Sequence, residues 1–150
     1  MATFTASQWT SSGQPKAGHT GVQCAIGNLV AVGVTGTASS VMYMVQVPVG
    51  CTIVDWMWSG EDLAADQTYK LGLRMPISDT WTLTESALAG DLSFTAGQTH
   101  RATNVKLPYK VSASSNAITQ WAWVQAVAKI AISASASHKL SVFYAMDTGG

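Results

Sequence analysis

The feature that most constrains the fold is a two-residue alternation of apolar and polar side chains. In residues 69–75, one face carries Tyr69, Leu71, Leu73 and Met75, and the other carries Lys70, Gly72 and Arg74. Residues 105–111 repeat this alternation around Pro108. A period of two predicts β-strands with one buried face. Because proline cannot donate a ladder hydrogen bond, the second strand is expected at a sheet edge or at a bulge.

Strand signals recur along the rest of the chain. Strands are predicted at residues 22–32, 41–47, 51–58 and 138–146, with weaker candidates around 81–83 and 92–94 separated by a long connection. Residues 128–133 and 138–146 are expected to pair as a hairpin, and residues 117–127 fit either a strand or a short amphipathic helix. About eight strands without intervening helices predict an all-β fold, either an antiparallel β-sandwich or a jelly roll.

The chain divides by composition into three parts. Residues 1–20 are polar and rich in Ser, Thr and Gly, with Phe4 and Trp9 as isolated large apolar groups. This segment is expected to be either a frayed terminus or an extended N-terminal arm that becomes ordered against a partner, with both aromatic residues as anchors. A β-sandwich domain is expected over residues 21–146, followed by a flexible tail at 147–150.

The chain carries little charge for a protein domain. Charged residues make up 11% of the sequence and the net charge is zero, whereas a soluble domain usually carries about 25% charged residues. A surface so poor in charge tends to self-associate, which favours an assembly component that neighbours cover. Neutrality argues against nucleic acid as a partner, because phosphate binding needs a basic excess. Lys106 and Lys110 are therefore expected to form a solvated strand face.

Neither a membrane span nor a signal peptide is recognisable. No stretch approaches the roughly 20 apolar residues that cross a bilayer, and the first residues lack a basic start and an apolar run. We therefore expect a protein made in the cytoplasm, without membrane partners. In that compartment Cys24 and Cys51 are expected to be buried thiols rather than a disulfide.

No catalytic or metal-binding constellation is recognisable. The three histidines are far apart in the sequence and lack the spacing of zinc ligands, so each is expected to be a polar surface or turn residue; they are His19, His100 and His138. The acidic stretch does not follow the spacing of a calcium loop, so a solvated loop is expected for Glu61, Asp62 and Asp66. Asp55 interrupts an apolar strand and would need a partner if buried. Nucleophile and phosphate-loop motifs are absent, so no enzyme, cofactor or metal site is predicted.

Six tryptophans are the remaining signal, and four of them form two pairs. In residues 51–58 the alternation places Val54, Trp56 and Trp58 on one face and Ile53, Asp55 and Met57 on the other. Trp121 and Trp123 form a second pair of the same kind. On a strand, each pair projects to one face. Each pair can therefore be part of the core, part of a protein interface, or a stacking platform for sugar rings.

Several segments carry a resemblance to a known family. They are the start MATFTASQWTSSGQPKAGHTG, the strand VQVPVGCTIVDWMW, the loop GEDL, and the strands KLGL and KLSVFYAMD. Together they resemble the small β-sandwich or jelly-roll decoration (cement) proteins of tailed-bacteriophage capsids. The resemblance implies a virion protein, made in the host cytoplasm, that binds the outside of an icosahedral shell as a dimer or trimer. It would stabilise contacts between major capsid subunits.

Partner contacts are predicted for four aromatic residues, Phe4, Trp9, Trp56 and Trp58. The alternative function is a carbohydrate-binding β-sandwich module that uses the paired tryptophans.

Overall fold

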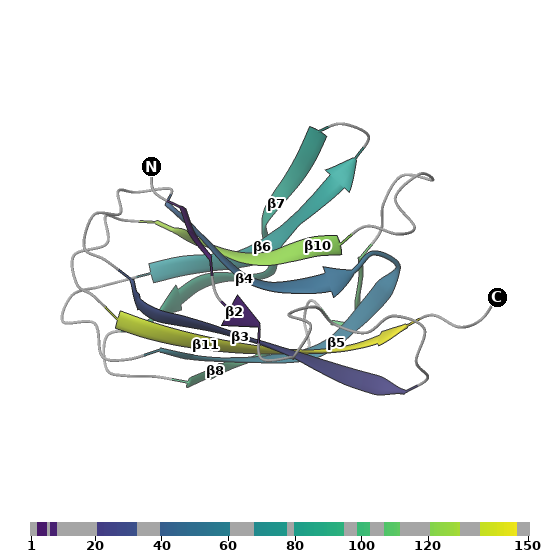
Figure 1. Ribbon diagram of the computed structural model, residues 1–150, viewed down its shortest axis with the longest axis horizontal. Coiled ribbons are helices and arrows are strands. Elements are labelled where there is room, and N and C mark those ends of the chain that lie inside the picture. The colour runs from purple at the N-terminus through teal and green to yellow at the C-terminus, as the bar shows by residue number, and fades with distance from the viewer. Residues whose placement is uncertain are drawn as a thin grey trace.

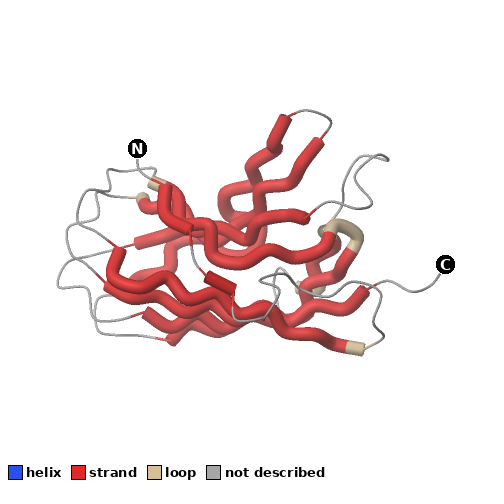
Figure 2. The backbone as a smooth tube through the Cα atoms, in the orientation of Figure 1, coloured by secondary structure: helices blue, strands red, loops and turns tan. Residues whose placement is uncertain are grey.

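The chain folds into two facing β-sheets. The computed structural model describes residues 3–5, 7–8, 21–32, 40–60, 68–77, 80–94, 99–102, 107–111, 121–129 and 136–146. Within these residues all regular structure is strand, and the two sheets lie one above the other (Figures 1 and 2). The predicted all-β sandwich is confirmed. No helix in this part of the chain is long and apolar enough to cross a membrane.

Each sheet has a simple strand order. Sheet A contains, in order, β1 (Thr3–Thr5), β4 (Val41–Pro48), β10 (Trp121–Ala128), β6 (Thr68–Ile77) and β7 (Thr80–Ser93). Sheet B contains, in order, β2 (Ser7–Gln8), β3 (Val22–Val32), β11 (Ala136–Met146), β5 (Cys51–Gly60) and β8 (Thr99–Arg101). The short strand β9 (Tyr109–Lys110) also pairs with β5. All pairings are antiparallel except that of β1 with β4.

The pairing is nested, as in one long hairpin rolled into a sandwich. β6 pairs with β7 at the tip, and β5 pairs with β8 and β9. β4 then pairs with β10, and β3 pairs with β11. This order is that of a jelly roll. The far end of the β6–β7 hairpin stands away from the body (Figure 1).

The nesting corrects two sequence predictions. The expected hairpin of residues 128–133 and 138–146 is wrong, because β11 pairs with β3 along one edge and with β5 along the other. Residues 130–133 themselves lie outside the described part. The two weak strands around 81–83 and 92–94 are one strand of 14 residues, β7. Its middle is poor in β-branched residues, so local propensity does not mark it. The register to β6 shifts there, from Thr84 opposite Leu73 to Ala89 opposite Leu71, and pairing on both sides of this irregularity keeps β7 in the sheet. The ambiguous segment 117–127 is a strand from Trp121 onward.

The alternating segments bury the predicted faces. In β6, Tyr69, Leu71 and Leu73 are buried, while Lys70 and Arg74 are half-buried on the outer face. In β11, the core-facing side chains of Leu140, Val142 and Tyr144 are buried. These side chains interdigitate with those of the opposite sheet to form one apolar core. Of the second alternating segment, residues 105–106 lie outside the described part, and β9 pairs at the edge of β5 as Pro108 predicts.

A bulge in β5 changes the predicted faces of that strand. Phe143 pairs with Asp55 and Tyr144 pairs with Ile53, so Val54 has no partner on β11. The extra residue moves Ile53 to the same face as Trp56 and Trp58, and all three are buried. Val54 is 38% exposed on the outer face. The predicted placement of Ile53 beside Asp55 and Val54 beside the tryptophans is therefore wrong, since a bulge inserts one residue into a strict alternation.

Candidate partner-binding site

The predicted partner residues Trp56 and Trp58 lie inside the sandwich. Their rings project from β5 into the core, with exposed fractions of 2% and 0%. Of the three roles open to this pair, the structure shows the core role. A sugar-stacking platform needs an exposed ring face, which neither residue has. A protein partner could reach these rings only if the two sheets separated.

Trp58 lies in a cluster of aromatic rings at one end of the core. Its ring centroid is 4.6 Å from that of Phe94, 5.5 Å from Tyr69 and 5.6 Å from His138. Gly60 permits this packing, because a Cβ there would lie 2.5 Å from a ring carbon of Phe94 and 2.9 Å from Nδ1 of His138. The cluster ties β5, β6 and β11 to the residue that follows β7.

Two histidines belong to this end of the core. His138 is buried with an exposed fraction of 2%, so the expected surface or turn position for it is wrong. His100 is half-buried, with its ring 4.8 Å from that of Phe94, and its Nε2 forms a 2.5 Å hydrogen bond with the carbonyl oxygen of Ser93. His19 lies outside the described residues.

The second tryptophan pair lies on the outer face of sheet A. Trp121 and Trp123 are half-buried, and the Trp123 ring lies 5.3 Å from that of Tyr43 at an interplanar angle of 35°. Arg74 Nη1 donates a 3.0 Å hydrogen bond to Tyr43 Oη. Gln125, which pairs with Tyr43 across β10 and β4, is fully buried, and its side-chain amide has no hydrogen-bond partner among the described residues. Of the two tryptophan pairs, Trp121 and Trp123 are therefore the pair with partly accessible rings.

The N-terminal segment lies along one edge of the sandwich. β1 pairs with β4 through Thr3 to Thr5, and β2 pairs with β3 through Ser7 and Gln8. The segment therefore passes from one sheet to the other (Figure 1). The backbone of Phe4 is opposite Met42 in this register, and Trp9 lies outside the described residues. Residues 3–5 and 7–8 thus pair with the chain's own sheets.

Gly27 brings the two sheets together at this same edge. A Cβ on Gly27 would lie 1.8 Å from the carbonyl oxygen of Met44 on β4. No side chain fits at that distance, so glycine is needed for β3 to approach β4. Sequence reasoning did not single out Gly27, because the close approach joins strands from different sheets.

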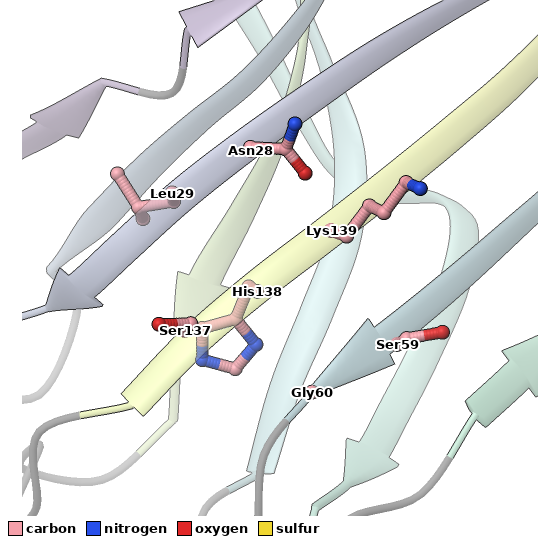
Figure 3. A pocket seen from close by; sticks show the side chains of 7 residues that line it. All are labelled: Asn28, Leu29, Ser59, Gly60, Ser137, His138 and Lys139. Atoms are coloured by element: carbon pink, nitrogen blue, oxygen red, sulfur yellow. The ribbon is translucent and has the colours of Figure 1, made fainter.

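A hollow opens at the end of sheet B, beside the aromatic cluster. Its volume is about 420 Å³, which is within the range of small-ligand pockets. Figure 3 shows Asn28, Lys139 and Ser59 in a row across β3, β11 and β5 at its mouth. The remaining lining comes from Leu29, Gly60, Ser137 and His138.

The charged residues that the structure describes do not converge on one site. Asp55 is exposed, and its carboxylate accepts a 2.8 Å hydrogen bond from the backbone N–H of Trp56. Asp91 accepts from Lys129 Nζ at 2.5 Å, and this contact lowers the pKa of the Asp91 carboxyl. No group of three metal-binding side chains occurs among the described residues. Glu61, Asp62, Asp66 and Lys106 lie outside them.

The two cysteines differ in accessibility. Both are free thiols, with Cys51 buried and Cys24 exposed, so the expectation of a buried Cys24 is wrong. Burial raises the pKa of Cys51 from its ordinary 9.0 to about 12. Burial likewise raises the pKa values of Tyr69 and Tyr144 from 10.0 to about 12.

These shifts predict alkaline destabilisation. At pH 8 and below, the three groups are almost entirely neutral in the folded and unfolded states alike, so the free energy of unfolding is close to its full value. From about pH 8 to 12 the groups ionise first in the unfolded chain, beginning with Cys51, so the free energy of unfolding falls as the pH rises. Urea denaturation at pH 8, 9.5 and 10.5 measures this decline. Tyr69→Phe, which removes one of the three groups, should make it shallower. Equal stability at all three pH values would contradict the expectation.

The fold is shared with chains from solved phage capsid structures. A chain in "Capsid of Ralstonia phage GP4" has a TM-score of 0.76 at 15% identity, over 98% of this chain and 99% of that chain. A chain in "Cyanophage Pam1 capsid asymmetric unit" has a TM-score of 0.60 at 19% identity, over 93% and 99%. A chain in "Acidic stable capsid structure of Helicobacter pylori bacteriophage KHP30" has a TM-score of 0.55 at 16% identity, over 85% and 90%.

Sequence comparison adds no relative. No family model matches the chain, and no curated protein matches it. At these identities the likeness to the three capsid chains concerns the fold. The chain therefore has a jelly-roll sandwich of a kind that also occurs, at nearly the same length, in phage capsid structures.

Proposed function

We propose that this protein is a structural virion protein of a bacteriophage. It binds the outer surface of an icosahedral capsid as a dimer or trimer and stabilises contacts between major capsid subunits. It is made in the host cytoplasm and resides on the capsid surface. In this role it is not an enzyme and needs no cofactor.

The observation that carries this proposal is the whole-chain likeness to chains in three phage capsid structures. The alignments cover 85% or more of this chain and 90% or more of each matched chain. The likeness is therefore to complete chains of similar size, not to one part of a larger protein. The low charge of the sequence fits a surface that neighbouring subunits cover.

The N-terminal edge supplies a physical means of binding. β1 and β2 pair through only three and two residues, so little holds them on their own sheets. An extended segment can add a strand to a partner's sheet edge, with side chains filling pockets beside it. In the proposal Phe4 and Trp9 are those side chains. A multimer that engages several sites gains avidity, so each contact can be weak.

The proposal predicts saturable binding to capsid shells. Shells assembled from the major capsid protein of the same phage, without this chain, are mixed with the purified protein and sedimented. We expect co-sedimentation at a fixed ratio of this chain to the capsid subunit. Absence of binding at micromolar concentrations of the chain would refute the proposal.

Variants of the arm separate its role from folding. Phe4→Ala combined with Trp9→Ala keeps the backbone that forms β1 and β2, and should weaken binding at least about tenfold if both are anchors. Deletion of residues 1–20 leaves strands β3 to β11 and should give the same or a larger loss. Both variants should retain a cooperative thermal transition. Unchanged binding by the deletion variant would remove the arm from the mechanism.

The carbohydrate-binding alternative now rests on the Trp121–Trp123 pair. The half-buried rings of this pair and of Tyr43 lie on the outer face of sheet A, where sugar rings can stack. A glycan array, followed by tryptophan fluorescence of Trp123→Ala, tests this function. Binding to a glycan that Trp123→Ala abolishes would favour the alternative.

A further inference from the structure

The outer face of sheet B carries an apolar centre that no described segment covers. Ala25, Val142 and Trp56 point into the core, so the residues next to them in the sequence point to the outer face of sheet B. The register aligns these outer residues in two adjacent rows, Cys24–Phe143–Asp55 and Ile26–Ser141–Met57. We call this surface the sheet B face.

The apolar centre includes the large apolar side chains that are most exposed among the described residues. Val22 at the start of β3 is 61% exposed, and Val54 in the bulge of β5 is 38% exposed. Ile26, Phe143 and Met57 between them are half-buried. The bulge is the reason that Val54 points outward, and bulges commonly redirect a side chain at functional positions.

Charged side chains surround this centre, and most of them are positive. Arg101, Lys110 and Lys139 are exposed cations on the strands of sheet B, and Asp55 is the one carboxylate on the described parts of these strands. The described strands of this face therefore carry a formal excess of two positive charges, although the whole chain is neutral. Two copies stacked through this face would bring like charges together, which disfavours self-association by this route.

The hollow described above forms one end of the same face. The row Asn28–Lys139–Ser59 is adjacent to the row that contains Ile26 and Met57. Lys139 thus stands at the mouth of a cavity whose inner wall includes Leu29 and the buried His138 (Figure 3). Such a cavity at the border of an apolar patch suits one inserted side chain of a partner, with its charge near Lys139.

We propose that the sheet B face docks on a capsid subunit whose contact surface has an apolar centre and an acidic border. One side chain of that subunit, a carboxylate or an aromatic residue flanked by carboxylates, enters the hollow beside Lys139. This proposal rests on the proposed function and names the surface through which it acts. An apolar centre with a polar rim is the usual anatomy of a protein interface.

The chain contains its own probe of this face. Cys24 is exposed beside Phe143, while Cys51 is buried in the core. Alkylation by iodoacetamide at pH 8, followed by mass spectrometry, therefore reports access to the sheet B face at Cys24. Cys51 serves as the internal control for unfolding. We expect Cys24 to react at least about tenfold more slowly in shell-bound protein than in free protein.

A charge reversal tests the border independently. Lys139→Glu is expected to weaken shell binding at least about tenfold and to reduce the salt dependence of the remaining binding. The matched control is Lys129→Glu, which makes the same change of charge beside sheet A, where Lys129 contacts Asp91. Both positions are exposed, so both variants should fold. Phe143→Ser should weaken binding without changing the salt dependence.

The outcomes separate this proposal from the proposed function. If wild-type protein binds shells while Cys24 reacts at the free rate and Lys139→Glu binds normally, the sheet B face is not the contact and the virion role stands. If wild-type protein does not bind, both proposals fail. If free protein is a dimer by light scattering and Cys24 is already protected in it, the face is occupied by a second copy, and the capsid contact is overturned.

Discussion

Trp58→Ala is expected to cost about 3–5 kcal/mol of unfolding free energy, as other large aromatic truncations in protein cores do. The Trp58 ring is fully buried and packs against Phe94, Tyr69 and His138 with centroids 4.6–5.6 Å apart. Its removal leaves a cavity among the rings of Tyr69 on β6, His138 on β11 and Phe94 after β7. For a chain of this size, the melting temperature should fall by about 6–20 °C.

Trp123→Ala is the matched control, because the same truncation is made at a half-buried ring outside the core. It should cost only about 1 kcal/mol. Trp58→Phe retains an aromatic ring in the cluster and should lie between the two. Guanidinium denaturation followed by circular dichroism measures all three. Equal losses for Trp58→Ala and Trp123→Ala would contradict the assignment of one pair to the core and the other to the surface.

The elements that the sequence predicted well are those with strong local alternation. β3 spans the predicted residues 22–32, and β6 buries the predicted face of Tyr69, Leu71 and Leu73. Period-two alternation requires only that one face be buried, so it can be recognised within a few residues. The fold class followed from such strands and from the absence of helical segments.

Features that depend on distant parts of the chain could not be predicted in this way. Whether residues 138–146 pair with the segment just before them or with β3 and β5 is decided by the nested roll, not by closeness in the sequence. The bulge at Val54 depends on its register with β11, and that register determines which face receives Ile53. A pattern of residues 51–58 alone has no information about that partner strand.

The same limit applies to the candidate site. A tryptophan pair on a strand looks identical in sequence whether its face is the core or the surface, and the two pairs differ in this respect. Cys24, Phe143 and Met57 come together only through the pairing of β3, β11 and β5. Phe4 and Trp9 remain a prediction, since the pairing of β1 and β2 concerns the backbone.

Gly27→Ala is expected to destabilise the fold by about 3 kcal/mol or more, at the upper end of overpacking effects. The added Cβ would lie 1.8 Å from the Met44 carbonyl oxygen and 3.1 Å from Cγ2 of Val45. The first atom belongs to the backbone of β4, so it cannot rotate away as a side chain would. β3 and β4 must therefore separate, and the melting temperature should fall by about 6 °C or more.

Gly90→Ala is the matched control for that substitution. A Cβ at Gly90 meets nothing within 4 Å, and the φ of Gly90 lies outside the left-handed region. The free energy of unfolding of Gly90→Ala should therefore remain within about 1 kcal/mol of the wild-type value. Alanine fits this site and also reduces the conformational freedom of the unfolded chain. Equal effects of the two substitutions would mean that β3 does not approach β4 as closely as the structure has it.

The Gly27 variant also connects stability to the proposed function. β2 pairs with Gly27 through Gln8, and β1 pairs with β4 close to Met44, so separation of the two strands changes the edge on which the N-terminal segment lies. Limited proteolysis of Gly27→Ala below its melting temperature should therefore cleave residues 1–20 faster than in wild-type protein. If the arm acts in a partner's sheet, shell binding by this variant should survive as long as the sandwich is folded. If residues 1–20 instead contribute to binding only while they are paired with β3 and β4 of their own chain, Gly27→Ala should show both faster cleavage of these residues and weaker binding to shells.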